Sequence, residues 1–389
     1  MRAIQYYGPG DVRLEEIPEP VVGPGQVKIK VAWCGICGSD LHLYHGALQG
    51  ATPTATEPHP VTGETLPVGM GHEFSGTIVE LGPNVDTARL SVGHNVTIEP
   101  AITCMQPSCP ACSTHGTRNL CPRSAYIGIS GRAGGLSEYV VVDQMLAHVL
   151  PAGTSLEVGA MMEPLAVGWH AVRKANFKTG NTALILGAGP VAILLLEVLK
   201  VFHPGWVGVS GRSKKRCELA EQHGASAVFN VRTAGVDVVA ETLKATGQLG
   251  VDVVFDCGGN QTTMDTATAA VRRGGTIMNL AVWSTKPVVD MTTLFFKEVT
   301  FANSMAYADD HPEMLEALGQ GRFGDLSSLI TRRIPLEDFV EKGIKALIHE
   351  KDQHVERDYM SHQLSTWRTA LAHVDAILRA REHGIPAYA

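Results

Sequence analysis

The chain lacks the features that mark secreted, membrane-spanning or nucleic-acid-binding proteins. Its longest apolar stretch, residues 191–202, contains Glu197 and Lys200 and is too short to cross a bilayer. The first residues hold no apolar segment followed by a cleavage site, so we expect no secretion signal and a cytoplasmic location. The net charge of -7, with no Lys/Arg run longer than residues 214–216, argues against nucleic acid as a partner.

Charged residues are also few, at 18% of the 389 residues, whereas hydrophobic residues reach 44%. This balance is typical of a folded globular protein rather than a disordered one, and the length favours two domains. Eight cysteines are present. In a cytoplasmic chain they are better explained as metal ligands or buried thiols than as disulfides, and Cys217 and Cys257 fit the role of buried thiols.

Two patterns of secondary structure follow each other along the chain. Up to about Pro151, short alternating segments separated by turns predict a β-rich module. From about Glu163, strand-like and helical segments alternate, which predicts a doubly wound parallel sheet. The predicted strands are residues 1–7, 11–17, 26–33, 74–82, 95–100 and 138–143, then 182–186, 206–210, 251–257, 276–282 and 299–307.

The fold class is therefore α/β, with a β-rich domain over residues 1–165 and a dinucleotide-binding domain over 166–307. Helices are expected within the second domain at residues 191–202 and 214–224, and after it at 312–319 and 336–349. We expect residues 308–389 to return to the first domain and to end in an amphipathic helix over 365–382.

Two short motifs, GICGSD at 35–40 and GHE at 71–73, predict a catalytic metal site. Cys37 and His72 are donors suited to Zn²⁺, and Glu163 is a third candidate because an acid among apolar residues is costly to bury unpaired. Asp40 could orient His72 through the nitrogen that does not bind metal. A structural pair of cysteines and an exposed Glu163 opening a helix are the alternatives.

Four further cysteines crowd into one polar loop, with four, two and eight residues between them. They predict a closed structural zinc lobe, since the metal would replace the hydrophobic core that the loop lacks. The four residues are Cys104, Cys109, Cys112 and Cys121.

A glycine-rich turn lies between a predicted strand and a predicted helix, at Gly187 and Gly189 with Pro190 and Val191. In that context it predicts a site for the diphosphate of a dinucleotide at the helix N-terminus. A glycine turn without a ligand is the alternative.

The end of the next strand bears on the choice of cofactor. An NAD site normally carries an acid there for the ribose 2′-hydroxyl, but this chain has Gly211 followed by Arg212, Ser213 and Arg216. A guanidinium suits a 2′-phosphate, so we predict preference for NADP(H). The alternative is that these cations only form a solvated helix start.

Together these motifs resemble the zinc-dependent medium-chain alcohol dehydrogenase/reductase superfamily from Met1 to about Val355. The segments VKIKVAWCGICGSDLHLY, EPHPVTGETLPVGMGHEFSG and MMEPLAVGWHAVR are most similar to the 2,3-butanediol dehydrogenase group. The resemblance implies a GroES-like catalytic domain and a Rossmann domain.

The same resemblance implies roles for individual residues. Cys37, His72 and Glu163 would bind the catalytic zinc, and Glu73 would lie beside it as a water-mediated or alternative ligand. Ser39 and His42 fall where the family places its proton relay. The implied reaction passes a hydride between a secondary alcohol or ketone and the nicotinamide, and relatives are usually homodimers or homotetramers.

The chain departs from the family at three places. The zinc lobe has longer spacings, and Gly211-Arg212 replaces the acid typical of the butanediol group. Relatives also continue past a similar DQHV segment with a short apolar strand, whereas Val355 here leads into ERDY, which predicts loss of that strand. The alternative functions are an NADPH-dependent enoyl or quinone reductase, which usually lacks the catalytic zinc ligands, and a non-catalytic cofactor-binding protein.

Overall fold

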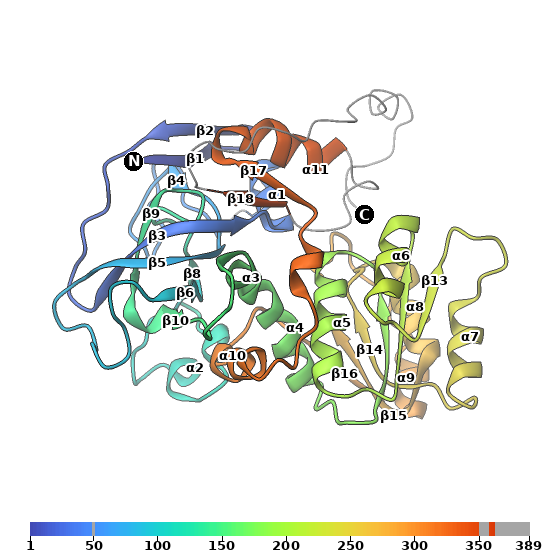
Figure 1. The fold of residues 1–389 in the computed structure, drawn as a ribbon. Helices are drawn as coiled ribbons and strands as arrows, with labels where there is room; N and C mark the ends of the chain where they lie inside the picture. The colour runs from blue at the N-terminus through green and yellow to red at the C-terminus, as the bar shows by residue number, and fades with distance from the viewer. Residues whose placement is uncertain (49–50, 350–357, 362–389) are drawn as a thin grey trace. The chain divides into compact units, whose positions relative to one another are not determined.

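The chain folds into two compact units, seen in a computed structural model that describes residues 1–48, 51–349 and 358–361 (Figure 1). The first unit contains Met1–Glu163, Ala308–Gly321 and the described residues from Asp325 onward. The second contains Pro164–Tyr307 and Arg322–Gly324. These limits lie close to the boundaries predicted at residues 165 and 307, and the chain returns to the first unit after the second.

The first unit is built on β-sheets. One sheet has the order β2-β1-β4, a small one pairs β7 with β8, and the largest has the order β10-β6-β5-β3-β18-β17 with β9 also pairing with β3. These strands are β1 (Arg2–Gly8), β2 (Asp11–Glu16), β3 (Gln26–Gly35), β4 (Val68–Gly69), β5 (Glu73–Leu81), β6 (Asn95–Ile98), β7 (Ala101–Ile102), β8 (Ala125–Tyr126), β9 (Tyr139–Asp143), β10 (Ala147–Val149), β17 (Arg332–Pro335) and β18 (Asp358–Ser361).

Strand β3 runs through the middle of the largest sheet. Val27, Ile29 and Val31 alternate along it and are almost fully buried, whereas Lys30 between them is exposed. This period of two places the apolar side chains on the core face. The strand pairs with both β5 and β9 and so organises the core of the unit.

The strand predicted to be lost near the end of the chain is present. β18 pairs in parallel with β17 and antiparallel with β3, where Met360 lies opposite Cys34. The expectation of a missing strand was wrong because backbone hydrogen bonding to two neighbours does not require the apolar sequence of the relatives.

Short helices connect or cover the strands of the first unit. The segment predicted as one helix at 336–349 is helical throughout, but it changes from a 3₁₀ turn to a π-helix and then to an α-helix. The helices are α1 (Gly38–Tyr44), α2 (Pro110–Ser113), η1 (Arg118–Leu120), η2 (Gln144–Leu146), α3 (Leu156–Ala160), α10 (His311–Gly319), η3 (Leu326–Leu329), η4 (Leu336–Asp338), η5 (Phe339–Ile344) and α11 (Lys345–His349).

The second unit is the predicted doubly wound domain. Its six parallel strands have the order β13-β12-β11-β14-β15-β16, and helices alternate with them along the chain (Figure 1). The strands are β11 (Thr182–Leu186), β12 (Trp206–Gly211), β13 (Ala227–Asn230), β14 (Val251–Asp256), β15 (Val271–Asn279) and β16 (Thr300–Asn303). The helices are α4 (Met162–Lys174), α5 (Pro190–Val201), α6 (Lys214–Gln222), α7 (Val238–Ala245), α8 (Gln261–Ala270) and α9 (Met291–Lys297).

The strand order reverses beside β11. Its neighbours are β12 on one side and β14 on the other, so the chain turns in opposite directions from this point. Ligands of open α/β sheets bind at the carboxyl ends of the strands beside such a reversal. The turn at Gly187 follows β11 directly.

The long apolar segment at residues 191–202 forms most of α5, a helix of 12 residues. Over the described residues, the helices are all too short or too polar for a membrane crossing. The amphipathic helix predicted over 365–382 lies outside the described residues.

Candidate active site and metal centres

Cys37, His72 and Glu73 converge in the first unit. Each offers one ligand atom, and these atoms all lie within 4.8 Å of one another. The antiparallel register of β3 and β5 places Gly35 opposite Glu73. The residues that follow β3 and those that begin β5 therefore meet at the same end of the sheet, which unites the two motifs predicted from the sequence.

The first turn of α1 fixes the position of Cys37. Its backbone N–H donates to Asp40 Oδ2 at 2.8 Å, and Asp40 is fully buried. Cys37 itself is the N-cap of the helix. Such reciprocal capping holds the backbone at a helix start and so sets the direction of the thiol.

His72 is buried among anionic groups. Ser39 Oγ lies 3.0 Å from its Nε2, and Asp40 Oδ1 lies 3.8 Å from its Nδ1, an ion-pair distance rather than a hydrogen bond. Burial lowers the pKa of His72, but the Cys37 thiolate and Asp40 raise that pKa to about 9. A site that favours a positive charge to this extent suits a divalent cation.

Glu163 lies beside this cluster rather than inside it. It is 6% exposed in the first turn of α4, and its charge helps to raise the pKa of both His72 and Cys34. Among the described residues, the carboxylate that converges with Cys37 and His72 is that of Glu73 and not that of Glu163. Ligation by Glu163 therefore stays a prediction.

Ser39 and His42 both belong to α1. They are three residues apart and so share one face of the helix. Ser39 is half-buried beside His72, whereas His42 is exposed. The two side chains thus run from the cluster toward solvent.

Cys34, the other cysteine of the pair, is fully buried. Its thiol donates to the carbonyl of Gly35 at 3.4 Å. Burial raises the pKa of Cys34 well above its ordinary value, and the nearby charges of Asp40 and Glu163 add to the effect. A thiol held protonated in this way is inert, because the thiolate is the metal ligand and nucleophile.

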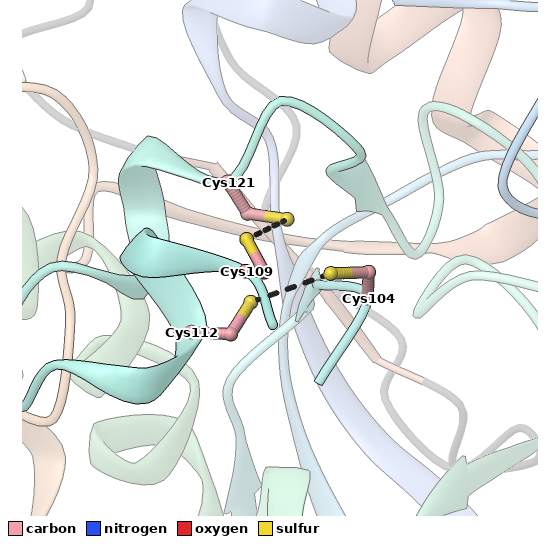
Figure 2. Close-up of side chains that lie close together, drawn as sticks. All are labelled: Cys104, Cys109, Cys112 and Cys121. Atoms are coloured by element: carbon pink, nitrogen blue, oxygen red, sulfur yellow. Dashed lines mark hydrogen bonds between the residues drawn. The ribbon is translucent and has the colours of Figure 1, made fainter. Parts of the chain in front are cut away.

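The four cysteines of the predicted lobe also converge (Figure 2). The Sγ atoms of Cys104 and Cys112 are 3.7 Å apart, and those of Cys109 and Cys121 are 3.9 Å apart. A tetrahedral zinc with bonds of about 2.3 Å separates its sulfur ligands by about 3.8 Å. The donor set and its spacing therefore fit a closed zinc site, despite the longer loops.

The lobe has little apolar material of its own to bury. Met105 and Leu120 are exposed, while Cys109 and Cys121 are among its buried side chains. A hydrogen bond from the backbone of Gln106 lowers the pKa of Cys104 to about 6, which favours a thiolate. Metal binding would supply the stability that a core supplies elsewhere.

A third group of possible ligands was not foreseen from the sequence. Glu99, His148 and His311 lie together in the first unit, with ligand atoms within 4.8 Å of one another. Glu99 and His148 each stand alone in an apolar strand-like segment, and His311 is more than 160 residues away. No local spacing links them, so only the tertiary fold reveals the group.

In the second unit the glycine turn forms the start of α5. Gly189 is the N-cap and Pro190 the first helical residue. A Cβ added to Gly189 would point into open space. The turn therefore leaves room beside a helix N-terminus, as the diphosphate of a dinucleotide requires.

Gly211 ends β12 next to this turn. A Cβ added there would lie 2.5 Å from the Cβ of Ala188, too close for a side chain unless Ala188 moves. Arg212 follows on the surface, Ser213 is the buried N-cap of α6, and Arg216 is half-buried in its first turn. The position that carries the acid in NAD sites is thus closed by packing.

Comparison with known proteins agrees with this architecture. Residues 23–152 match the alcohol dehydrogenase GroES-like domain, and residues 190–320 match the zinc-binding dehydrogenase domain. The chain is 38% identical over 356 residues to the (R,R)-butanediol dehydrogenase of Bacillus subtilis, covering 91% of this chain and 98% of that one.

Two solved structures show the same likeness. The crystal structure of 2R,3R-butanediol dehydrogenase from Bacillus subtilis superposes with a TM-score of 0.85 at 37% identity, covering 93% of this chain and 99% of that one. A zinc-binding dehydrogenase from Sinorhizobium meliloti, solved bound to NADP, gives a TM-score of 0.80 at 30% identity, covering 92% and 98%.

The fold, the converging Cys37, His72 and Glu73, and these matches define the class: the chain belongs to the zinc-dependent medium-chain alcohol dehydrogenase/reductase superfamily. Within it, the chain is similar to the 2,3-butanediol dehydrogenase group. It is a zinc-type alcohol or diol oxidoreductase.

Proposed function

We propose that this protein transfers a hydride between NADP(H) and a small secondary alcohol or ketone, in the class of 2,3-butanediol, acetoin and related diols and acyloins. The convergence of Cys37, His72 and Glu73 supports the reaction class. The substrate class rests on the likeness to (R,R)-butanediol dehydrogenases.

Cys37 and His72 would hold the catalytic zinc, with Glu73 or Glu163 as the carboxylate partner. Zinc bound there supplies a Lewis acid for the oxygen of the alcohol or ketone. Asp40 holds the backbone of Cys37 and lies beside the His72 ring, so it positions both ligands without being one.

Ser39 would exchange a proton with the substrate oxygen, and His42 would pass it to solvent. Their spacing on one face of α1, one half-buried and the other exposed, supports this direction. Ser39 Oγ lies 3.0 Å from His72 Nε2, the ring nitrogen opposite the one beside Asp40, so the hydroxyl lies next to the position where this nitrogen would bind metal.

Preference for NADP(H) rests on the end of β12. Gly211 has no side chain to hold a ribose 2′-hydroxyl, and the exposed Arg212 offers a guanidinium where a 2′-phosphate would lie. A Cβ at residue 211 would lie 2.5 Å from the Cβ of Ala188, so an acid at this position would require Ala188 to move. Each charge-assisted hydrogen bond to the phosphate contributes roughly 1.5–3 kcal/mol.

The test compares kcat/KM for NADP⁺ and NAD⁺ with a panel of diols and acyloins. We expect NADP⁺ to be preferred, and Arg212→Ala to reduce that preference by about tenfold or more. Lys215→Ala is the matched control, since it removes an exposed cation from the first turn of α6, three residues further along the chain. Preference for NAD⁺ that survives Arg212→Ala refutes the assignment of the cofactor.

The enoyl or quinone reductase alternative is tested by metal content. Such enzymes usually lack the catalytic zinc, so turnover that persists in metal-free protein would favour them. A non-catalytic protein would give no turnover over the whole panel with either cofactor.

We also propose a homo-oligomer. β16 is the edge strand of the second unit's sheet and pairs, among the described strands, with β15 alone. Phe301 of this strand and Phe295 and Phe296 of the preceding α9 are exposed. An open strand edge with exposed aromatic side chains suits pairing with a second copy. Light scattering should give at least twice the mass of the chain, and Phe301→Lys should lower it.

A further inference from the structure

A cluster of ionisable side chains, Glu99, His148 and His311, lies outside both the catalytic cluster and the cysteine lobe. Both histidines approach the same carboxylate oxygen: Glu99 Oε2 lies 3.2 Å from His148 Nε2 and 3.5 Å from His311 Nδ1. The two imidazole rings are stacked, with centroids 4.9 Å apart and planes inclined by 11°. Both imidazole nitrogens therefore lie within 3.5 Å of one carboxylate oxygen.

Three separate segments of the first unit supply these donors. Glu99 follows β6, and His148 lies in β10, which pairs antiparallel with β6. The backbone N–H of Glu99 also donates to the carbonyl of Leu146 at 2.9 Å. His311 begins α10, in the segment that returns from the second unit. The group therefore ties the returning segment to two strands.

The separations match those of ligands on one metal ion. With zinc–nitrogen bonds of about 2.0–2.1 Å, tetrahedral geometry places neighbouring donor atoms about 3.4 Å apart. The donor distances of 3.2 and 3.5 Å lie close to this value. Binding of one ion by both nitrogens also requires the stacked rings to turn, so that their in-plane lone pairs meet.

Two of the three donors are closed off from solvent and the third lies at its edge. His311 and Glu99 are fully buried, while the His148 side chain is 13% exposed and offers a path from solvent.

The charged side chains around the group are mostly acidic. Arg118 contacts the other oxygen of Glu99, Oε1, at 2.5 Å and also contacts Asp309 at 3.0 Å. Asp310 is fully buried next to His311. His115 Nδ1 also lies 3.1 Å from Asp309, and Asp310 accepts from the backbone N–H of Ala308 at 2.9 Å, so a cation beside Glu99 would meet more carboxylates than Lys or Arg side chains.

We propose that Glu99, His148 and His311 form a third metal site, selective for a borderline divalent cation such as Zn²⁺ and separate from the catalytic cluster and the cysteine lobe. One carboxylate and two imidazoles are a donor set typical of such ions. The metal holds α10 against β6 and β10, beside the lobe that carries Arg118. The role is structural, because the site is buried and none of its three residues belongs to the catalytic cluster.

The test is the zinc content of the full-length protein after saturation with ZnCl₂ and desalting. His148→Gln removes one donor at the partly exposed edge while keeping a polar side chain beside Glu99. We expect this variant to hold one zinc per chain less than the wild type. His203→Gln is the matched control, because His203 is an exposed histidine of the second unit, away from the group and from the cysteine lobe, and should leave the zinc content unchanged.

Two further readouts complete the test. Zn²⁺ should raise the Tm of the wild-type apoprotein more than that of His148→Gln, and Co²⁺ at this site should give ligand-field bands without sulfur charge-transfer bands. Because the comparison is between variant and wild type, it is informative even if the catalytic cluster binds no metal. Equal zinc content and equal Tm shifts would overturn the proposal, leaving a group held by hydrogen bonds and Arg118 alone.

Discussion

The cysteine lobe and the catalytic cluster are two metal-binding regions of one unit, built in different ways. The lobe takes four like donors from a single loop, residues 104–121. The cluster takes unlike donors from segments that meet only through the pairing of β3 with β5. The lobe's ligands thus depend on local spacing, and the cluster's depend on the register of the sheet.

Because of this difference, we expect the lobe to stabilise the fold and the cluster to carry out the reaction. Four thiolates fill a tetrahedral ion completely and leave no place for substrate, whereas three protein ligands leave one place open. The cluster also has a hydroxyl, Ser39, beside it and an imidazole, His42, one turn further on. Damage to the lobe should therefore lower stability, and damage to the cluster should lower the rate with the fold intact.

The largest effect is expected from Cys37→Ala. Loss of the thiolate should lower kcat/KM at least about a thousandfold, roughly 4 kcal/mol, because the substrate oxygen loses its Lewis acid. Steady-state kinetics and thermal unfolding should be measured together. The Tm should change little, since Cys37 lies at the N-cap of a short helix. An inactive variant that is also unfolded would remove the distinction between the two regions.

The converse is expected of Cys109→Ser. Losing one buried thiolate of the closed site should cost about 4 kcal/mol of unfolding free energy, a size typical of metal loss. Denaturant unfolding with zinc analysis checks this. Cys217→Ser, which changes a buried cysteine outside both regions, should keep its zinc. Wild-type stability of the Cys109 variant would show that the lobe needs no metal.

A smaller effect is expected from Ser39→Ala. Removing the hydroxyl beside His72 should lower kcat about a hundredfold, roughly 2.7 kcal/mol, with zinc content unchanged. The kinetic pH profile should change as well, because proton transfer no longer passes through a side chain. Normal kcat in this variant would exclude Ser39 from the proton path.

The smallest effect is expected from His42→Ala. This side chain is exposed, so buffer and water can replace it in part, and we expect a decrease in kcat of about tenfold or less. High concentrations of imidazole should restore part of the loss. His45→Ala is the matched control, because His45 is also exposed but lies just past the end of α1. Equal losses in both variants would mean that His42 has no specific role.

Sequence reasoning reached the features that depend on local patterns. Alternating apolar residues in β3 and the strand-turn-helix at Gly189 predict their own structure, and the crowding of Cys104 to Cys121 predicts a site. It could not foresee β18, because the pairing of that strand with β17 and β3 depends on long-range register.

The group of Glu99, His148 and His311 was missed for a related reason. Its members come from a strand end, a second strand and a returning helix, so their proximity depends on the whole first unit. Likewise, the lack of an acid at residue 211 is visible in the sequence, but only the structure shows that a side chain there would clash with Ala188. Long-range register decides such contacts.

The central claim is that catalysis needs the metal of the open cluster while the fold needs the metal of the closed lobe. The most direct measurement follows zinc content, turnover of a secondary diol with NADP⁺ and Tm in one sample during gradual chelation. We predict that turnover is lost before the Tm falls and returns when Zn²⁺ is added back. Full turnover by protein that contains no metal would contradict the account.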